Sequence, residues 1–405
     1  MPTDVLILGA GPAGAALARQ LALAGFKVVL TDRAAFPRSK PCGEFLSPQC
    51  TPYLVALGLP SLLADTGAFA VRGLQLGGFG AQATGHFRAL PERGPHTAIG
   101  YGIRREVFDH ALVQAAVAAG TQFLPRHECV DLVRAEDGRV LGAVLRAPDG
   151  QPQPHLATWT IGADGVHSRV ARWLGVQRRL EWLDQFALAA HFRNVPVRDT
   201  ANVQLLKGGF FAATTVDEDL FSVNLVLPRQ RLRERTSPDW DAFVADALVD
   251  APELRERLAA GERLRPWRGT GPFAYATTTC TLPGVALVGD AAGYIDPMTG
   301  EGIYFALFGA RALGDALAAA LHAPADAEAA MRGYRRTLAG ELDARKLASK
   351  LLQRAVRRPW LVRPFVRLLQ RWPGAADLLV TLTGDTIHPR DLLRPSFWKS
   401  WRSSA

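Results

Sequence analysis

The sequence predicts an α/β fold in which a mainly parallel sheet is interrupted by an inserted antiparallel one. Three patterns carry this prediction. Residues 4–32 read as a buried strand, a glycine-rich turn, a helix and a second strand. Residues 186–228 alternate strongly between apolar and polar side chains, as antiparallel strands with one wet face do. A buried strand returns at 284–290, so the antiparallel module is predicted to lie within the parallel one.

The opening unit has the spacing of a dinucleotide-binding turn. Val5–Leu8 form a short apolar strand that leads into Gly9, Gly11 and Gly14. Gly9 permits the tight turn, Gly11 lets a pyrophosphate approach the backbone, and Gly14 lets the helix pack on the sheet. The helix start offers N–H groups and its positive dipole end. Asp32 ends the next strand and can accept hydrogen bonds from a ribose, so the unit predicts an adenine-dinucleotide site.

Further elements follow in order along the chain. Helices are predicted at 48–57, 103–119, 238–260 and 302–321, and strands at 121–123, 129–133, 140–145 and 158–162. An Asp137-Gly138 turn is expected to join the strands at 129–133 and 140–145. Beyond residue 345, prolines 359, 364 and 373 are expected to break the chain into short helical pieces.

The composition is that of an ordinary globular protein, with 48% hydrophobic and 21% charged residues. No signal peptide is expected before the first strand, and no apolar run approaches the roughly 18 residues of a membrane span. The four cysteines include no Cys-x-x-Cys pair and no histidine clusters beside them. The sequence therefore predicts a reduced, cytoplasmic protein without a disulfide framework or a metal site.

Positive charge is concentrated at the C-terminal end. Residues 345–405 hold thirteen Lys and Arg against three Asp, which accounts for the whole net charge of +9. Trp and Phe residues are interleaved with these charges. One interpretation is a basic helical cap whose aromatic residues pack on the body. The other is peripheral association with anionic lipid at the inner face of the membrane. No nucleic-acid partner is expected, because no recognised nucleic-acid module accompanies the charge.

Two further motifs stand at the ends of predicted strands. Gly162-Ala-Asp164-Gly165 closes the strand at 158–162. Gly289-Asp290-Ala-Ala-Gly293 closes the strand at 284–290, and Asp296-Pro297-Met-Thr-Gly300-Glu301-Gly302 then opens a helix. A carboxylate beside glycine at a strand end can hold a sugar-like hydroxyl while the backbone approaches closely. Each motif is common alone, and only their combination is informative.

In this order and spacing, the three motifs resemble the single-Rossmann flavoproteins of the para-hydroxybenzoate hydroxylase superfamily over about residues 3–320. Lys40-Pro-Cys42-Gly43-Glu44 and Thr299-Gly-Glu-Gly-Ile303 resemble its geranylgeranyl reductase-like branch, which includes natural-product oxidoreductases. The resemblance implies a Rossmann-type FAD-binding domain with an inserted antiparallel-sheet substrate domain. The FAD-binding domain is predicted at 1–75, 96–180 and 275–345, the substrate domain at 76–95 and 181–274, and a basic helical C-terminal segment at 346–405.

The resemblance implies FAD as cofactor and assigns roles to individual residues. The three glycines would line the pyrophosphate, Asp32 would bind the adenosine ribose, and Arg105 would contact the phosphate and ribityl region. Asp290 would hold the ribityl chain. Gly300, Glu301 and Gly302 would bring backbone N–H groups and a helix start beside N1 and the C2 carbonyl of the flavin, stabilising the negative charge of its reduced form. Further predicted cofactor positions are Arg33, Arg38 and Asp164.

Several residues carry a second interpretation. Arg38 and Lys40 could hold a flavin phosphate or NAD(P)H, or could simply be solvated. Asp164 could hold its loop to the nucleotide-binding core instead of contacting the flavin. Cys42 resembles a position near the flavin ring, where it could have a chemical role or be a small packing residue. Pro297 is predicted to lie at the face of the flavin.

The reaction is constrained by two absences in the sequence. No second Gly-x-Gly-x-x-Gly occurs, so the resemblance implies that NAD(P)H reduces the flavin transiently. The Tyr-x-Trp-x-Phe-Pro stretch of prenyl reductases is replaced by residues 209–217, Gly-Phe-Phe-Ala-Ala-Thr-Thr-Val-Asp. We expect an FAD-dependent oxidoreductase acting on a small apolar or aromatic substrate, polyketide- or isoprenoid-like. The missing stretch favours a monooxygenase over an ene reductase. A third interpretation is a non-catalytic protein that binds prenyl groups as an escort. Separately, His167 and His191 are expected to be hydrogen-bonded structural residues.

Overall fold

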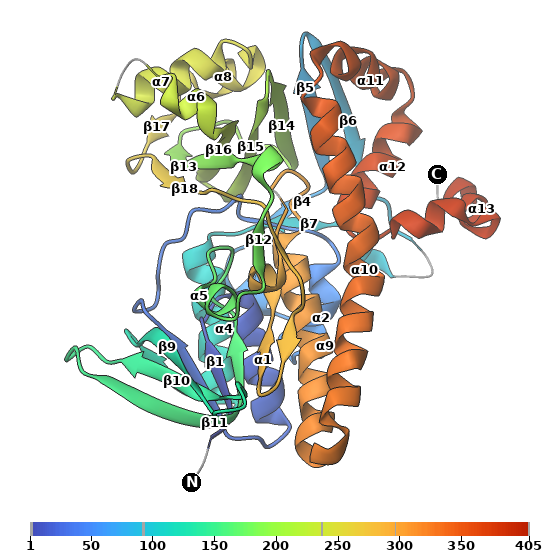
Figure 1. Cartoon of the computed structure of the whole chain (residues 1–405). Helices are drawn as coiled ribbons and strands as arrows, with labels where there is room; N and C mark the ends of the chain where they lie inside the picture. The colour runs from blue at the N-terminus through green and yellow to red at the C-terminus, as the bar shows by residue number, and fades with distance from the viewer. Residues whose placement is uncertain (1–2, 91–93, 236–237, 296, 404–405) are drawn as a thin grey trace.

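The computed structural model describes residues 3–90, 94–235, 238–295 and 297–403. The molecule contains a body built on a mainly parallel sheet, a second sheet, and a helical C-terminal segment (Figure 1). The helices and 3-10 turns are α1 Pro12–Leu23, α2 Cys50–Ala56, α3 Leu62–Asp65, η1 Pro95–Ala98, α4 Arg105–Ala118, α5 Arg169–Trp173, η2 Glu181–Leu183, α6 Arg229–Arg233, α7 Trp240–Leu248, α8 Pro252–Leu258, η3 Gly289–Ala292, α9 Gly302–His322, η4 Pro324–Asp326, α10 Ala327–Val356, α11 Pro359–Arg371, α12 Pro373–Thr383, η5 Pro389–Leu393 and α13 Pro395–Ser403.

The strands are β1 Thr3–Leu8, β2 Val28–Asp32, β3 Phe45–Leu46, β4 Phe69–Val71, β5 Gly73–Gly78, β6 Ala81–His86, β7 Gly100–Gly102, β8 Gln122–Pro125, β9 Glu128–Arg134, β10 Val140–Arg146, β11 Pro152–Gly162, β12 Gln177–Arg179, β13 Gln185–Arg193, β14 Thr200–Leu206, β15 Gly209–Asp217, β16 Leu220–Pro228, β17 Glu262–Arg263, β18 Arg268–Thr270, β19 Tyr275–Thr277, β20 Thr281–Leu282 and β21 Val285–Leu287.

The sheet of the body has the strand order β20-β21-β11-β1-β2-β8, and its strands from β21 to β8 are parallel. Val5–Leu8 at its centre are almost completely buried, as expected of a parallel strand covered on both faces. Helices α4, α1 and α9 pack in turn beside this sheet. The first half of β11 leaves the sheet and pairs with the hairpin β9–β10. The expected Rossmann-type α/β fold is therefore confirmed.

The second sheet has the order β17-β13-β16-β15-β14-β5-β6 and is antiparallel except at β14–β5. The expectation of one wet face is wrong. Every residue of β16 except its last is buried, because both faces of the sheet are covered. Helices α7 and α8 pack on one face around Val223 and Leu225, whereas the other face, around Phe210 and Val226, meets helices of the C-terminal segment.

Two domain boundaries lie elsewhere than the sequence predicted. Strand β5 begins at Gly73, so a boundary after residue 75 would cut a strand of the second sheet. Helix α10 runs without a break through the boundary expected at 345/346 and packs along α9 (Figure 1). Pro364 lies inside α11 and does not break it. Pro364 is exposed, so the backbone carbonyl four residues before it, which has no N–H partner in the helix, faces solvent and can bond to water.

The C-terminal segment folds back onto the second sheet. Helices α11 and α12 pack against β5 and β6 at the upper end of α10 (Figure 1). The carbonyl of Ala376 approaches Gly85 so closely that a side chain on this glycine would collide with it. Further along, the Arg88 guanidinium stacks on Trp401, 4.4 Å from the ring centre, and pairs with Asp377. The segment thus packs on the body, although Trp360 and Trp372 in it stay exposed.

Within the described residues, helix α9 is long and apolar enough to cross a membrane by length and composition. The sequence expectation had excluded any such run. More than half of the qualifying window is buried, because α9 packs between α1 and α10. Its apolar character is therefore used in the body of the protein.

Candidate active site

The turn between β1 and α1 leaves room for a ligand at one of its three glycines. Gly9 has φ 112°, and a Cβ there would lie 2.4 Å from the carbonyl oxygen of Ala163. A Cβ on Gly14 would lie 1.9 Å from the carbonyl oxygen of Gly9. At Gly11 the nearest atom to such a Cβ is Nη2 of Arg38, 3.7 Å away. Gly9 and Gly14 are thus required by the turn, whereas Gly11 faces open space at the start of α1.

Asp32 and Arg38 border the same turn. One carboxylate oxygen of Asp32 accepts a hydrogen bond from the backbone N–H of Ala10 at 3.0 Å, and the other accepts one from Ala34 at 2.9 Å. Arg38 Nε lies 3.6 Å from Asp32 Oδ2, and its Nη1 lies 3.4 Å from Asp109 Oδ2. Arg38 is therefore held against the turn and is not merely solvated. A guanidinium in this place can pair with a phosphate.

Arg105 organises the wall opposite the turn. It begins α4 and donates two hydrogen bonds to the buried carboxylate of Asp109, at 2.7 and 2.8 Å. Burial lowers the pKa of Arg105, but Asp109 and Cys42 together raise it by more, so the guanidinium stays charged. Its Nη1 also donates to Sγ of Cys42 at 3.4 Å, and its backbone N–H donates to Glu44 at 3.0 Å. Arg105 thereby fixes both Cys42 and Glu44.

A cavity of about 160 Å³, called the ring cavity below, lies among these groups. It is lined by the β1–α1 turn, residues 40–45, the start of α9 and strands of the second sheet. Lys40 and Asp290 both line it and attract each other. Burial lowers the pKa of Lys40, and the charge of Arg105 lowers it further. Burial raises the pKa of Asp290, which the positive charges of Lys40 and Arg105 oppose.

The start of α9 closes the ring cavity on one side. Pro297, Gly300 and Gly302 line the cavity, and Gly300 adopts φ 73°. The positive end of the 21-residue helix α9 therefore borders the cavity. Glu301 does not line the cavity, and its carboxylate lies 3.5 Å from Nη1 of Arg345. Asp296, noted in the sequence beside Pro297, lies outside the described residues.

Asp164 and Arg33 are among the predicted cofactor residues that do not line the ring cavity. The Asp164 carboxylate accepts hydrogen bonds from the backbone N–H groups of Arg169 at 2.7 Å and Val170 at 3.3 Å, at the start of α5. This favours the loop-holding interpretation of Asp164, and its neighbours Ala163 and Gly165 line the cavity instead. Arg33 is exposed after β2.

A contact that the sequence did not predict joins the second sheet to this site. Glu44 is buried, lines the ring cavity and adopts φ 57°. Its Oε2 lies 2.5 Å from Nε2 of His191 on β13. The expected structural role of His191 agrees with this contact. Glu44 stood within the Lys40–Glu44 motif, but nothing along the chain indicated that His191 would be its partner.

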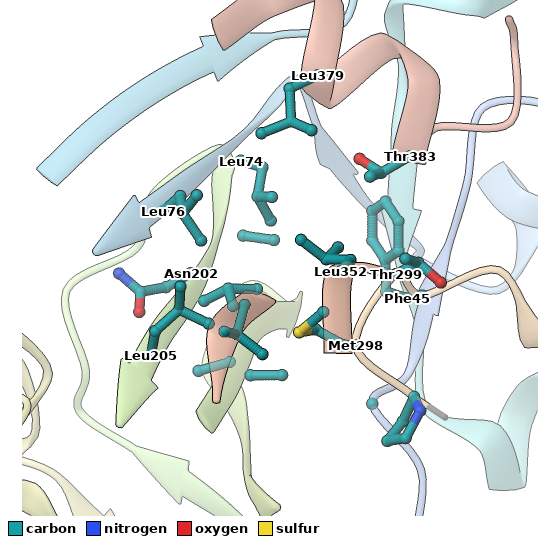
Figure 2. A pocket seen from close by; sticks show the side chains of 18 of the residues that line it. Phe45, Leu74, Leu76, Asn202, Leu205, Met298, Thr299, Leu352, Leu379 and Thr383 are labelled. Carbon is teal, nitrogen blue, oxygen red and sulfur yellow. The ribbon is translucent and has the colours of Figure 1, made fainter. Parts of the chain in front are cut away.

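A second cavity, the apolar pocket, adjoins the ring cavity and has a volume of about 380 Å³. Figure 2 shows side chains from the second sheet and from the C-terminal helices surrounding it. Its lining is apolar except for Asn202, Thr214, Thr299 and Thr383. The two cavities share five lining residues, which we call the junction: Gly43, Phe45, Ala212, Pro297 and Gly300.

The C-terminal helices form one wall of the apolar pocket. Leu352 and Val356 come from α10, Phe365 from α11 and Leu379 from α12. At the level of sequence the basic segment had two interpretations, a helical cap and a lipid-binding surface. Neither included a role in forming the wall of a pocket. The available signal was the recurrence of apolar residues every three or four positions, which indicates a helix face that packs on something. It did not indicate that the face encloses a cavity.

The residues around the β1–α1 turn and the ring cavity fit FAD. Four features lie next to one another here. They are a glycine turn without side chains, a carboxylate at the end of β2, two basic groups near the turn, and the start of a helix. The ring cavity meets the apolar pocket at the junction. This places room for a phosphate at Gly11 and room for a ring system next to an apolar chamber.

Comparison with known proteins identifies the family. The model described as "FAD binding domain" matches residues 2–336. Digeranylgeranylglycerophospholipid reductase 1 of Methanopyrus kandleri is 30% identical over 324 residues, covering 78% of this chain and 80% of that protein. The menaquinone reductase of Mycolicibacterium smegmatis is 29% identical over 75% of this chain and 73% of its own length. A pyrrole-2-carbonyl-[peptidyl-carrier protein] chlorinase of Pseudomonas fluorescens is 26% identical, covering 78% and 76%.

Solved structures show the same fold. A flavin-dependent brominase superposes with a TM-score of 0.83 at 21% identity, covering 100% of this chain and 99% of that one. A geranylgeranyl bacteriochlorophyll reductase-like protein from Thermoplasma acidophilum gives 0.79 at 21% identity, with both chains covered completely. The chain belongs to the FAD-binding domain family of flavoprotein oxidoreductases, whose members similar to it include both halogenases and geranylgeranyl reductase-like proteins.

Proposed function

We propose that this FAD-dependent oxidoreductase is a monooxygenase that takes electrons from NAD(P)H and inserts one oxygen atom into a long apolar or aromatic substrate. The observation that carries the proposal is the apolar pocket, which adjoins the ring cavity and shares the five residues of the junction with it. A substrate in that pocket would present its reacting carbon at the junction. The substrate loses a C–H bond and gains C–OH, while the second oxygen atom of O₂ leaves as water with the two electrons of NAD(P)H.

The chain's own residues would bind and orient the two molecules. Arg38 and the start of α9 hold negative charge on the cofactor, and Arg105 fixes the wall that carries Cys42 and Glu44. The apolar lining excludes water from the junction. Bound FAD supplies the redox chemistry, either with O₂ or by hydride transfer.

The lining of the junction supports monooxygenation. Its five residues have no ionisable side chain, so they offer no acid to a substrate carbon. Oxygen insertion requires a dry site beside the flavin ring, and it does not require an acid that protonates a substrate carbon. Double-bond reduction, in contrast, requires a proton for the carbon that does not receive the hydride.

The second candidate is an ene reductase that saturates double bonds of an isoprenoid lipid, as the names of several relatives suggest. The specific observation in its favour is Glu44, which lines the ring cavity and is hydrogen-bonded to His191. In this reaction hydride passes to one alkene carbon, and the Glu44–His191 pair would deliver the proton to the other. Cys42, held 3.4 Å from Arg105 Nη1, would remain a positioning residue in both reactions.

Isotopically labelled oxygen separates the two reactions. FAD-loaded protein is reduced with NADPH or NADH without oxygen in the presence of either a long-chain alkylphenol or a geranylgeranyl lipid, and labelled O₂ is then admitted. The proposal predicts one labelled oxygen atom per product and no product before oxygen is admitted. Product that has gained two hydrogens without oxygen would contradict it and establish the ene reductase.

Glu44→Gln distinguishes the two reactions independently. It should leave oxygen insertion within about threefold of the wild type, whereas loss of a general acid lowers a rate by roughly a hundredfold or more. A protein that binds no FAD would contradict both candidates.

A further inference from the structure

Helix α11 presents two apolar surfaces, and the fold uses only one of them. Val362, Val366 and Leu369 are buried against the second sheet. A separate stripe recurs every fourth residue, which places Trp360, Pro364 and Leu368 on one side of the helix, and Trp372 follows directly after its last residue. This outer stripe consists of Trp360, Pro364, Leu368 and Trp372. Trp360 is 71% exposed and Trp372 is 63% exposed, so these large rings contact water.

Basic residues border the outer stripe. Arg363, Arg367 and Arg371 are all exposed on α11. Between residues 345 and 376 the chain carries nine Lys and Arg and no Asp or Glu. Within the described part of the chain, none of these three arginines forms a salt bridge. A surface with apolar rings beside uncompensated arginines matches the headgroup region of an anionic bilayer.

The apolar pocket reaches the surface at the same helix. Leu361 and Phe365 line the pocket, and Phe365 is also 38% exposed. Phe365 thus lies both at the wall of the pocket and at the surface of α11. Figure 2 shows the pocket continuing from Met298 and Phe45, beside the junction, to Leu352 and Leu379 of the C-terminal helices.

We propose that α11, with Trp372, docks the protein on an anionic lipid bilayer and that a lipid-soluble substrate enters the apolar pocket beside Phe365. The outer stripe would lie among the headgroups while the three arginines contact lipid phosphates. Charge complementarity favours an anionic bilayer as the occupant, because exposed tryptophan rings stand beside three exposed arginines on the same surface. The docking itself stands on the surface of α11 alone, whereas the entry of substrate rests on the proposed function.

Vesicle partitioning of the FAD-loaded full chain tests the docking. Vesicles of equal parts phosphatidylcholine and phosphatidylglycerol are compared with pure phosphatidylcholine, and binding is measured by flotation at low and high salt. Removal of two surface arginines, Arg363→Ala with Arg367→Ala, should weaken partitioning about thirtyfold at low salt. Trp360→Ser with Leu368→Ser should weaken it at least about tenfold. High salt should weaken the wild type strongly.

The matched control removes the same charge elsewhere in the segment. Arg390→Ala with Arg394→Ala, at η5, should change partitioning less than about threefold, because η5 packs against α10 and α13. Equal loss in this control, or equal binding of the wild type to pure phosphatidylcholine, would overturn the proposal. Protein that ignores both kinds of vesicle would also overturn it.

The FAD content and turnover of the same samples are measured with detergent-dispersed substrate. This separates the docking from the proposed function. If turnover persists without vesicle binding, the docking alone is refuted. If FAD content and turnover are lost while vesicle binding persists, the proposed function alone is refuted.

Discussion

The three glycines of the β1–α1 turn differ in what an added methyl group would meet. At Gly9 and Gly14 it would meet backbone atoms of the turn and of the loop after β11, closer than any normal contact. At Gly11 it would point into the space near Arg38. The turn itself therefore tolerates a methyl group only at Gly11, where we expect the pyrophosphate to lie.

Gly11→Ala should consequently weaken FAD binding without unfolding the protein. We expect the dissociation constant for FAD to rise at least about tenfold, since the methyl group would occupy the place of the phosphate. The melting temperature of the apoprotein should change by less than about 3 °C. The measurements are fluorescence titration with FAD and thermal unfolding without it. Gly333→Ala, in α10 with no atom within 4 Å of its added Cβ, is the control. Unchanged FAD affinity in Gly11→Ala would contradict the placement.

Residues of the glycine turn could be predicted because their geometry depends on neighbours along the chain. Asp32 likewise follows its strand directly and bonds to the backbone of Ala10. The pairs Arg38–Asp109 and Glu44–His191 join residues that are far apart in sequence. No local pattern encodes such pairs, so they required the structure. For the same reason the sequence left the role of Arg38 open.

At the scale of elements, a buried charge cluster fixes the start of α9. Arg345 of α10 donates to Glu341 at 2.9 Å and to Asp385 at 3.1 Å, and it lies 3.5 Å from Glu301. Three carboxylates thus share one guanidinium. Burial, together with the neighbouring charge of Glu301, raises the pKa of Asp385 well above its ordinary value. Asp385 therefore tends to hold a proton in the folded protein.

Asp385→Asn should reveal this proton through the pH dependence of stability. A carboxyl group with a raised pKa in the folded state contributes stability below its unfolded pKa, and this contribution is lost as the pH rises towards the folded pKa. Asparagine resembles the protonated carboxyl group and does not ionise, so its contribution to stability does not fall as the pH rises. The variant should therefore gain stability relative to the wild type from about pH 4 upwards, by at most about 1.4 kcal/mol per pH unit.

Urea unfolding of both proteins at several pH values measures this gain. Asp385→Ala provides the contrast, because it also removes the hydrogen bond to Arg345 and should be less stable than Asp385→Asn at every pH. A difference between wild type and Asp385→Asn that is constant with pH would show that Asp385 is ionised in the folded protein.

The long elements were predictable from periodicity, and the C-terminal ones were less so. Helices α4 and α9 lie within two residues of their predicted ranges, since both show a clear apolar face. The C-terminal segment was expected to form short pieces, and helices do begin at Pro359 and Pro373, but α10 enters the segment from residue 327 without a break. Prolines in sequence indicate possible breaks, but Pro364 sits on an exposed helix face where a missing N–H costs little.

At the scale of the whole molecule, the apolar pocket is assembled from parts distant in sequence. It combines β5 and β14–β15 of the second sheet, the loop before α9, and helices α10–α12. The sequence predicted the two modules but not that the last helices would close the chamber and cover a sheet face expected to be wet. That outcome depends on tertiary packing.

Leu352→Trp tests whether α10 forms a wall of the substrate chamber. The larger ring should fill part of the pocket, so the KM for a long-chain substrate should rise at least about tenfold while FAD affinity stays unchanged. Steady-state turnover with long- and short-chain alkylphenols in detergent measures the effect, which should be small for the short chain.

The neighbouring Leu351→Trp is a matched control, because Leu351 is exposed and outside the pocket. Equal effects of the two substitutions would contradict the assignment of the chamber.

The most direct test of the account is a crystal structure of the protein with FAD and a long-chain alkylphenol. We expect the pyrophosphate at Gly11, the ribityl chain near Asp290, and the flavin ring in the ring cavity against Pro297. The phenol should lie at the junction, with its alkyl chain running towards Leu352. A flavin ring bound outside the ring cavity, or an alkyl chain bound away from the apolar pocket, would contradict the account.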